Sequence, residues 1–233
     1  MNHLTVQVLF GMIVATGLAP QSAPAQHEGH GHAEKAPPTA AVPMCPVMDE
    51  PVNLAVSVAT DDGPVFFCCK DCITKYQADP AKYAAQVSAQ RKALADRPKI
   101  QVTCPVSKDP VDPKAFTDTD KGKVYFCCSG CINKFKADPA KYAVALANSY
   151  TYQTQCPVME EEINPKSFTT LANGHKVYFC CDRCENKLFA KPSEYLPRLK
   201  AQGYDFKPEE MAHEKAGGHD DTDDHGAHGH GGR

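Results

Sequence analysis

Twelve cysteines are the residues of this 233-residue chain whose type and spacing could do chemistry. They form three groups of four with one shared pattern: a Cys-Pro-Val stretch, whose cysteine is followed after 22 or 23 intervening residues by a Cys-Cys-x-x-Cys run. The groups are Cys45, Cys68, Cys69 and Cys72; Cys104, Cys127, Cys128 and Cys131; and Cys156, Cys180, Cys181 and Cys184. Thiolates bind soft transition metals, and exported thiols also pair as disulfides, so both interpretations are open at this point.

The segments that must position these cysteines predict a β-hairpin followed by a helix. Turn-forming residues lie at 61–64, 120–122 and 173–174, each ahead of a short aromatic strand with the sequence VFF or VYF. A hairpin of this length returns the chain to its start, so the single cysteine and the cysteine run converge. The run then enters a helix, in which cysteines three or four positions apart share one face. Amide groups at a helix N-terminus also favour the thiolate form.

A second helix is expected after the first in each repeat. Asp-Pro pairs at 79–80 and 138–139 read as an N-cap with proline at the first helical position. In the first repeat this helix should run to about Asp96. In the third repeat a lysine replaces the aspartate, so we expect Ser193 to shift the cap and Pro197 to shorten or kink the helix.

Composition limits the function classes. The formal net charge is only −3, with 25 basic and 28 acidic residues, which argues against a nucleic-acid-binding protein. Hydrophobic residues make up 42% of the chain, but many are Ala and Cys, so one large aliphatic core is not expected. Several small modules held together by something besides apolar packing fit better. No catalytic constellation is recognisable, and we expect a protein that is not an enzyme.

The third residue after each single cysteine differs among the repeats. It is Met48 in the first, Ser107 in the second and Met159 in the third. A thioether is a poor ligand for Zn²⁺ and a good one for Cu(I), so Met48 and Met159 are candidate copper ligands. Packing in the turn is an equally good interpretation of the two methionines.

The complete pattern resembles the YHS and TRASH family of metal-binding modules. The residues that carry the resemblance are Cys-Pro-Val, Val-Tyr-Phe-Cys-Cys-x-x-Cys, the Lys-Phe pair that follows, and Asp-Pro-x-x-Tyr. The resemblance implies an α+β chain of three small treble-clef-like cysteine modules in tandem, at 44–97, 98–149 and 150–204. We call them modules 1, 2 and 3.

The resemblance also implies a ligand set for each module. By the family pattern the ligands are Cys45, Cys68 and Cys72; Cys104, Cys127 and Cys131; and Cys156, Cys180 and Cys184. The second cysteine of each doublet, namely Cys69, Cys128 or Cys181, is an additional candidate. Each module could then hold up to one copper or zinc ion.

The two ends of the chain differ in kind from the modules. Residues 1–25 hold an apolar stretch and a small-x-small site ending at Ala25, which predicts a secretory signal peptide, with a membrane anchor as the alternative. Segments 26–43 and 205–233 are rich in His and Gly, and we expect both to be disordered and to capture metal weakly. After cleavage the protein should be periplasmic or extracellular, without stable membrane insertion.

These observations favour an exported protein that buffers, carries or detoxifies a soft metal, with copper ahead of zinc. Its partners would be metal ions and an envelope metal transporter or efflux protein. The alternative is a scaffold, stabilised by structural metal or disulfides, that presents a protein-interaction surface in the cell envelope. A third hypothesis, a thiol–disulfide oxidoreductase using the Cys-x-x-Cys pairs, lacks the βαβ context that such enzymes show.

Overall fold

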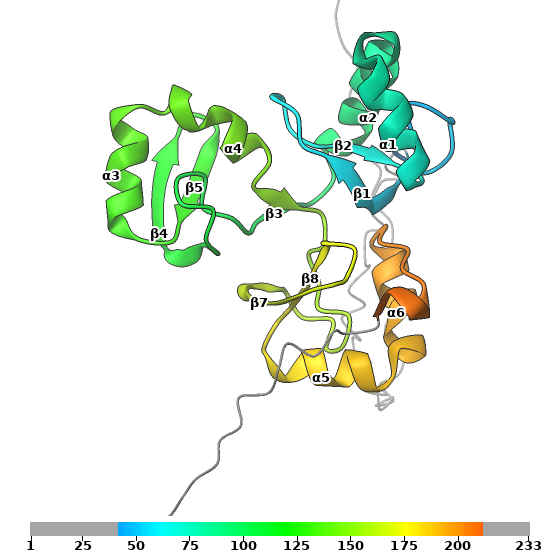
Figure 1. The fold of residues 1–233 in the computed structure, drawn as a ribbon. Helices are drawn as coiled ribbons and strands as arrows, with labels where there is room; N and C mark the ends of the chain where they lie inside the picture. Colours follow the sequence, from blue (N-terminus) through cyan, green and yellow to red (C-terminus); the bar gives the residue numbers. More distant parts are fainter. Residues whose placement is uncertain (1–41, 212–233) are drawn as a thin grey trace, which may run out of the picture. The chain divides into compact units, whose positions relative to one another are not determined.

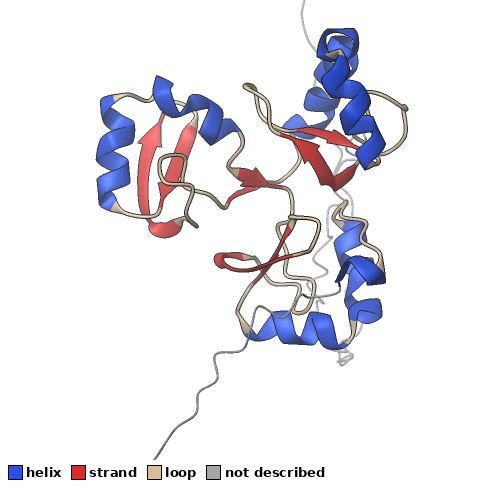
Figure 2. Cartoon of the chain, in the orientation of Figure 1, coloured by secondary structure: helices blue, strands red, loops and turns tan. Residues whose placement is uncertain are grey.

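The computed structural model describes residues 42–211. The predicted signal peptide and most of the two His-rich segments lie outside this range. Within it, small antiparallel sheets and helices follow one another three times along the chain (Figures 1 and 2), so the predicted α+β class is confirmed. No helix among the described residues is both long and apolar enough to cross a bilayer.

Each module contains the predicted hairpin. The pairs are β1 (Asn53–Val58) with β2 (Val65–Phe67), β4 (Asp112–Thr119) with β5 (Gly122–Phe126), and β7 (Asn164–Thr170) with β8 (Lys176–Phe179). All three are antiparallel. In each, the pairing register shifts near the start of the first strand, between Asn53 and Ser57, Asp112 and Phe116, or Asn164 and Phe168. Glycines in the connecting turns adopt φ values of +105° at Gly63, +107° at Gly122 and +83° at Gly174, which other residues rarely tolerate. The repeated sequence therefore folds into a repeated hairpin.

A helix follows each hairpin at the cysteine run. These helices are α1 (Lys70–Ala78), α3 (Ser129–Ala137) and α5 (Arg183–Ala190). Their inner faces pack on the last residue of the preceding strand: Phe67 lies 5.3 Å from Tyr76, and Phe126 lies 5.3 Å from Phe135, measured between ring centroids. These contacts fix where the cysteines of the helix point.

The Asp-Pro pairs of modules 1 and 2 each lead into a 3₁₀ turn, and the second α-helix follows that turn. Asp79 accepts a hydrogen bond from the backbone N–H of Lys82, ahead of the 3₁₀ turn η1 (Pro80–Tyr83) and α2 (Ala84–Ala95). Helix α2 is capped at Asp96, where the sequence places its end. The corresponding segments of the later modules are η2 (Ala140–Tyr142) with α4 (Ala143–Ala147), and α6 (Pro192–Ala201).

One expectation about α6 is wrong. Ser193 does not shift the cap, because Pro192 takes the first helical position directly after Lys191 and needs no N–H partner there. The helix continues past Pro197 to Ala201. Ser193 and Pro197 are both exposed, so water can satisfy the carbonyl group that the proline leaves without a partner.

The packed part of module 3 continues past residue 204. Phe206 and Met211 are buried, and the 3₁₀ turn η3 (Pro208–Met211) closes the described chain. They share one buried cluster with Leu54 of module 1, whose backbone N–H donates to Gly203 O at 2.9 Å. A short sheet of β3 (Ile100–Gln101) and β6 (Tyr150–Thr151) joins the segments that lead into modules 2 and 3.

Candidate metal centres

Three groups of three cysteines bring their sulfur atoms within 4.8 Å of one another, one group in each module. They are Cys45, Cys68 and Cys72; Cys104, Cys127 and Cys131; and Cys156, Cys180 and Cys184. We call each group a triad. The triads are the ligand sets that the family resemblance implies, and all twelve cysteines are free thiols.

Sulfur spacing in the triads suits a bound metal ion. The Sγ–Sγ distances are 3.6 Å for Cys68–Cys72, 3.5 Å for Cys127–Cys131 and 3.7 Å for Cys180–Cys184. Four thiolates about 2.3 Å from a tetrahedral metal lie about 3.8 Å apart, close to these values. The third sulfur of each triad lies within 4.8 Å of the other two, so each triad could hold one ion.

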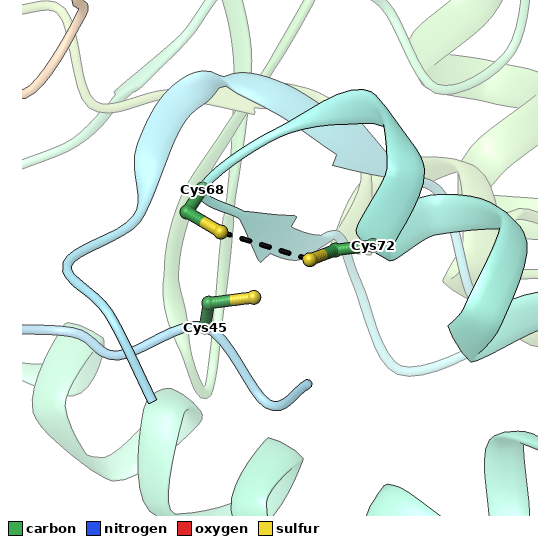
Figure 3. Close-up of side chains that lie close together, drawn as sticks. All are labelled: Cys45, Cys68 and Cys72. Atoms are coloured by element: carbon green, nitrogen blue, oxygen red, sulfur yellow. Dashed lines mark hydrogen bonds between the residues drawn. The ribbon is translucent and has the colours of Figure 1, made fainter. Parts of the chain in front are cut away.

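Three structural elements place the sulfur atoms of a triad. In module 1, Cys45 comes from the turn before the hairpin, Cys68 follows β2, and Cys72 lies in the first turn of α1 (Figure 3). All three side chains point toward one another in Figure 3. Cys45 and Cys72 are each only 1% exposed, so the centre lies largely inside the module.

The turn that carries the first cysteine has the same backbone geometry in every module. In module 1 the Cys45 N–H donates to Glu50 O at 2.7 Å, and the Asp49 N–H donates to Cys45 O at 3.0 Å. Asp49, Lys108 and Glu160 occupy the left-handed region, with φ values of +55°, +68° and +61°. This tight turn aims backbone N–H groups at the sulfur of the first cysteine.

Those N–H groups stabilise a thiolate at the first cysteine. Burial by itself raises the pKa of Cys45, but hydrogen bonds from backbone N–H groups outweigh it and lower the pKa below its usual value. The same balance lowers the pKa of Cys156. For Cys104 burial is outweighed by hydrogen bonds with the side chain and backbone of Ser107, and the pKa falls to about 7.

The other two thiols of each triad favour the protonated form. Burial raises the pKa of Cys68 and Cys180 to about 11 and that of Cys131 to about 12. Burial also raises the pKa of Cys72 and Cys184. An ion entering a triad must therefore displace protons mainly from these two positions.

This asymmetry predicts the pH dependence of metal binding. For module 2, below pH 7 we expect close to three protons released for each ion bound, falling toward two near pH 8 as Cys104 becomes a thiolate in the free protein. Affinity should therefore rise with pH, more steeply below pH 7 than above it. Titration calorimetry in buffers of different ionisation enthalpy measures the proton count directly. A constant count from pH 6 to pH 9 would contradict the assignment.

Three buried glutamines hold the triads together, and the sequence analysis missed them. In module 3, Gln153 Oε1 accepts from Tyr178 N at 2.9 Å, while its Nε2 donates to Tyr178 O at 2.6 Å and to Gln155 O at 3.2 Å. Tyr178 lies two residues before Cys180, and Gln155 directly precedes Cys156. The side chain therefore connects the two backbone segments that carry these cysteines.

Modules 1 and 2 contain the same connection. Gln101 bonds both backbone groups of Tyr125 and the carbonyl of Thr103. In module 1 the glutamine comes from helix α2: Gln90 bonds both backbone groups of Phe66 and the carbonyl of Met44. In modules 2 and 3 the glutamine could have been found from the sequence, because both modules share a Gln-x-x-Cys pattern that ends at the first cysteine. In module 1 no such pattern precedes Cys45, so the sequence does not point to Gln90.

The remaining candidate ligands lie on the solvent side of the triads. Cys69 and Cys128 are exposed and Cys181 is partly exposed. Met48 and Met159 are 52% and 49% exposed, which disfavours packing as their role. Serine stands at the matching position of module 2, where Ser107 Oγ lies 3.2 Å from Cys127 Sγ. This contact shows that a side chain at that position can reach the triad.

Comparison with models of protein families, with curated proteins and with solved structures found no match to the chain.

Proposed function

We propose that the protein binds a soft transition metal, copper ahead of zinc, and buffers it, carries it or confers resistance to it. The observation that carries the proposal is the triad: three thiols with sulfur atoms within 4.8 Å of one another, two of them at metal–thiolate spacing, repeated in three modules. Soft thiolate ligands favour Cu(I) and zinc over the harder ions. The proposal gives the protein no catalytic role.

The open side of each triad favours a cargo metal over a structural one. Structural zinc sites are closed by four protein ligands. Here three cysteines converge in each module, and the fourth sulfur is an exposed or partly exposed cysteine outside the triad. An ion held in this way remains within reach of an incoming ligand.

The wider context comes from the sequence. The motif resemblance to YHS and TRASH modules supports treble-clef-like units and a role in metal handling. The apolar N-terminal stretch supports export to the periplasm or extracellular space, where a metal transporter or efflux protein would be the partner. His-rich segments at both ends would capture metal weakly and supply it to the thiolates.

A structural-metal scaffold is the second candidate, and one observation favours it. The buried triad cysteines belong to the hydrophobic cluster of each module, so an ion there would also stabilise the fold. The two functions differ in exchange: a cargo ion should leave to a competing chelator within minutes, and a structural ion should stay until the module unfolds.

Metal analysis and thiol counting on protein purified without added metal test the proposal. We expect up to three ions per chain and twelve titratable thiols after anaerobic removal of the metal. The proposal would be refuted if the purified protein contained disulfides and, after reduction, bound neither Cu(I) nor Zn²⁺.

The residue at the open side of each triad should tune metal preference. Ser107→Met in the full chain should raise the preference of module 2 for Cu(I) over Zn²⁺ by about 1–2 kcal/mol, since a thioether adds affinity for Cu(I) and little for Zn²⁺. Met48→Ser should lower that of module 1 by a similar amount. Anaerobic competition titrations with both metals measure the change. If both substitutions are silent, the methionines are not ligands.

A further inference from the structure

An exposed or partly exposed cysteine lies against each triad. In module 1, Cys69 Sγ lies 3.6 Å from Cys72 Sγ and 3.9 Å from Cys68 Sγ. The corresponding contacts are 3.7 Å between Cys127 and Cys128, and 3.6 Å between Cys181 and Cys184. These distances of 3.6–3.9 Å are close to the shared Cys–Cys edges of the triads, 3.5–3.7 Å, so the additional sulfur is placed as a ligand would be.

The four sulfur atoms of module 1 form two triangles with a common edge. The inner triangle is the triad, Cys45, Cys68 and Cys72. The outer triangle is Cys68, Cys69 and Cys72, and its three edges measure 3.9, 3.6 and 3.6 Å. In modules 2 and 3 two edges of the outer triangle lie between 3.5 and 3.7 Å.

Burial separates the two triangles. Cys45 is 1% exposed, and Cys104 and Cys156 are fully buried, whereas Cys69 and Cys128 are exposed. Cys69 and Cys128 are the N-cap residues of α1 and α3, in extended conformation, and the Cys69 sulfur lies 3.6 Å from that of the buried Cys72. An ion arriving from solvent meets the outer triangle first.

We propose, on the basis of the metal-carrying function above, that Cys69, Cys128 and Cys181 are exchange ligands. They bind the ion transiently as it enters or leaves the triad. The ion keeps its bonds to the two shared cysteines throughout, so it is never released as a free ion inside the protein.

The transfer step in module 1 is a ligand substitution. The ion in the outer triangle forms a bond to Cys45 Sγ and breaks its bond to Cys69 Sγ, while Cys68 and Cys72 stay bound. The Cys45 thiol gives up any proton that it carries, and the Cys69 thiolate takes one from solvent. The oxidation state of the ion does not change. Release follows the same path in reverse.

Two matched triple variants of the full chain test the proposal. The first replaces the exchange ligands (Cys69→Ser, Cys128→Ser and Cys181→Ser), and the second replaces the buried first cysteines (Cys45→Ser, Cys104→Ser and Cys156→Ser). Each reduced protein is loaded anaerobically with Cu(I), and transfer to a colorimetric Cu(I) chelator is followed by stopped flow. Equilibrium competition with the same chelator gives the affinity, and circular dichroism reports the fold.

The exchange-ligand variant should keep its stoichiometry and an affinity within roughly threefold of the unmodified chain. Its transfer rate should fall about tenfold or more. The first-cysteine variant should lose tight binding. If the serine substitutions disturb the fold, the same measurements are made on the variant with alanine at Cys69, Cys128 and Cys181.

Two results would overturn the proposal. One is an exchange-ligand variant that transfers Cu(I) as fast as the unmodified chain. The other is a loss of affinity as large as in the first-cysteine variant, which would make these cysteines permanent ligands. In either case the unmodified chain still binds metal, so the proposed function stands. Failure of the unmodified chain to bind Cu(I) or Zn²⁺ would instead refute the proposed function.

Discussion

Removal of the metal from the reduced protein should unfold module 2 before the other two modules. Its buried cluster has six residues, of which Cys104 and Cys131 are triad cysteines, so little apolar packing remains without the ion. Cores of this size supply at most about 3–5 kcal/mol. We therefore expect module 2 to be largely unfolded at 25 °C after chelation.

Modules 1 and 3 should resist better, because they share a larger cluster. Leu54 and Phe66 of module 1 are buried in the same cluster as Leu199 and Tyr204 of module 3. Hydrogen exchange measured along the chain, with and without a chelator under anaerobic reducing conditions, separates the modules. Restoring the metal should restore protection. Protection that stays unchanged in all three modules after complete removal of the metal would show that the ions do not stabilise the fold.

Replacing a buried glutamine should cost more stability than replacing any exposed side chain. Gln153→Leu removes three hydrogen bonds and leaves the N–H and C=O of Tyr178 buried without this partner. Each such group costs about 1–3 kcal/mol, so we expect a loss of about 3–5 kcal/mol in the free energy of unfolding of module 3.

The same substitution should weaken the metal site that the glutamine supports. Outer groups that orient metal ligands are worth 10–100-fold in affinity, so the affinity of the third triad should fall at least about tenfold. Gln77→Leu is the matched control, because Gln77 is exposed and no hydrogen bond of its side chain is observed. Chemical denaturation and competition titration measure the two effects. If Gln153→Leu behaved like Gln77→Leu in both, the glutamines would not position the triads.

The convergence of each single cysteine with its cysteine run could be predicted from the sequence because local rules determine it. A hairpin returns the chain over a known distance, and the choice of Cys68, Cys127 and Cys180 as triad members came from the family resemblance. The repetition of these short-range patterns three times made the prediction robust. The hairpins, the 3₁₀ turns at the Asp-Pro pairs and the end of α2 follow from the same local chemistry.

The sequence did not distinguish the two cysteines of each doublet. Cys68 and Cys69 lie where a strand, with alternating side chains, passes into a helix with a period of 3.6 residues. Neither period applies at the junction, so the inward or outward direction of each sulfur depends on the packing of Phe67 against α1. The structure is needed to separate the buried triad from the exposed exchange ligand.

The sequence by itself determined three copies of a hairpin–helix unit with converging cysteines, since these depend on contacts between near neighbours. Tertiary structure alone decided what supports them. The Gln90 side chain donates a hydrogen bond to the carbonyl of Met44, 46 positions away in the chain. The Leu54 N–H donates to the carbonyl of Gly203, which is much farther away in the sequence. The core of module 3 extends to Met211 because Phe206 and Met211 find apolar partners there. Such long-range contacts leave no periodic trace in one sequence, because each depends on how whole modules pack.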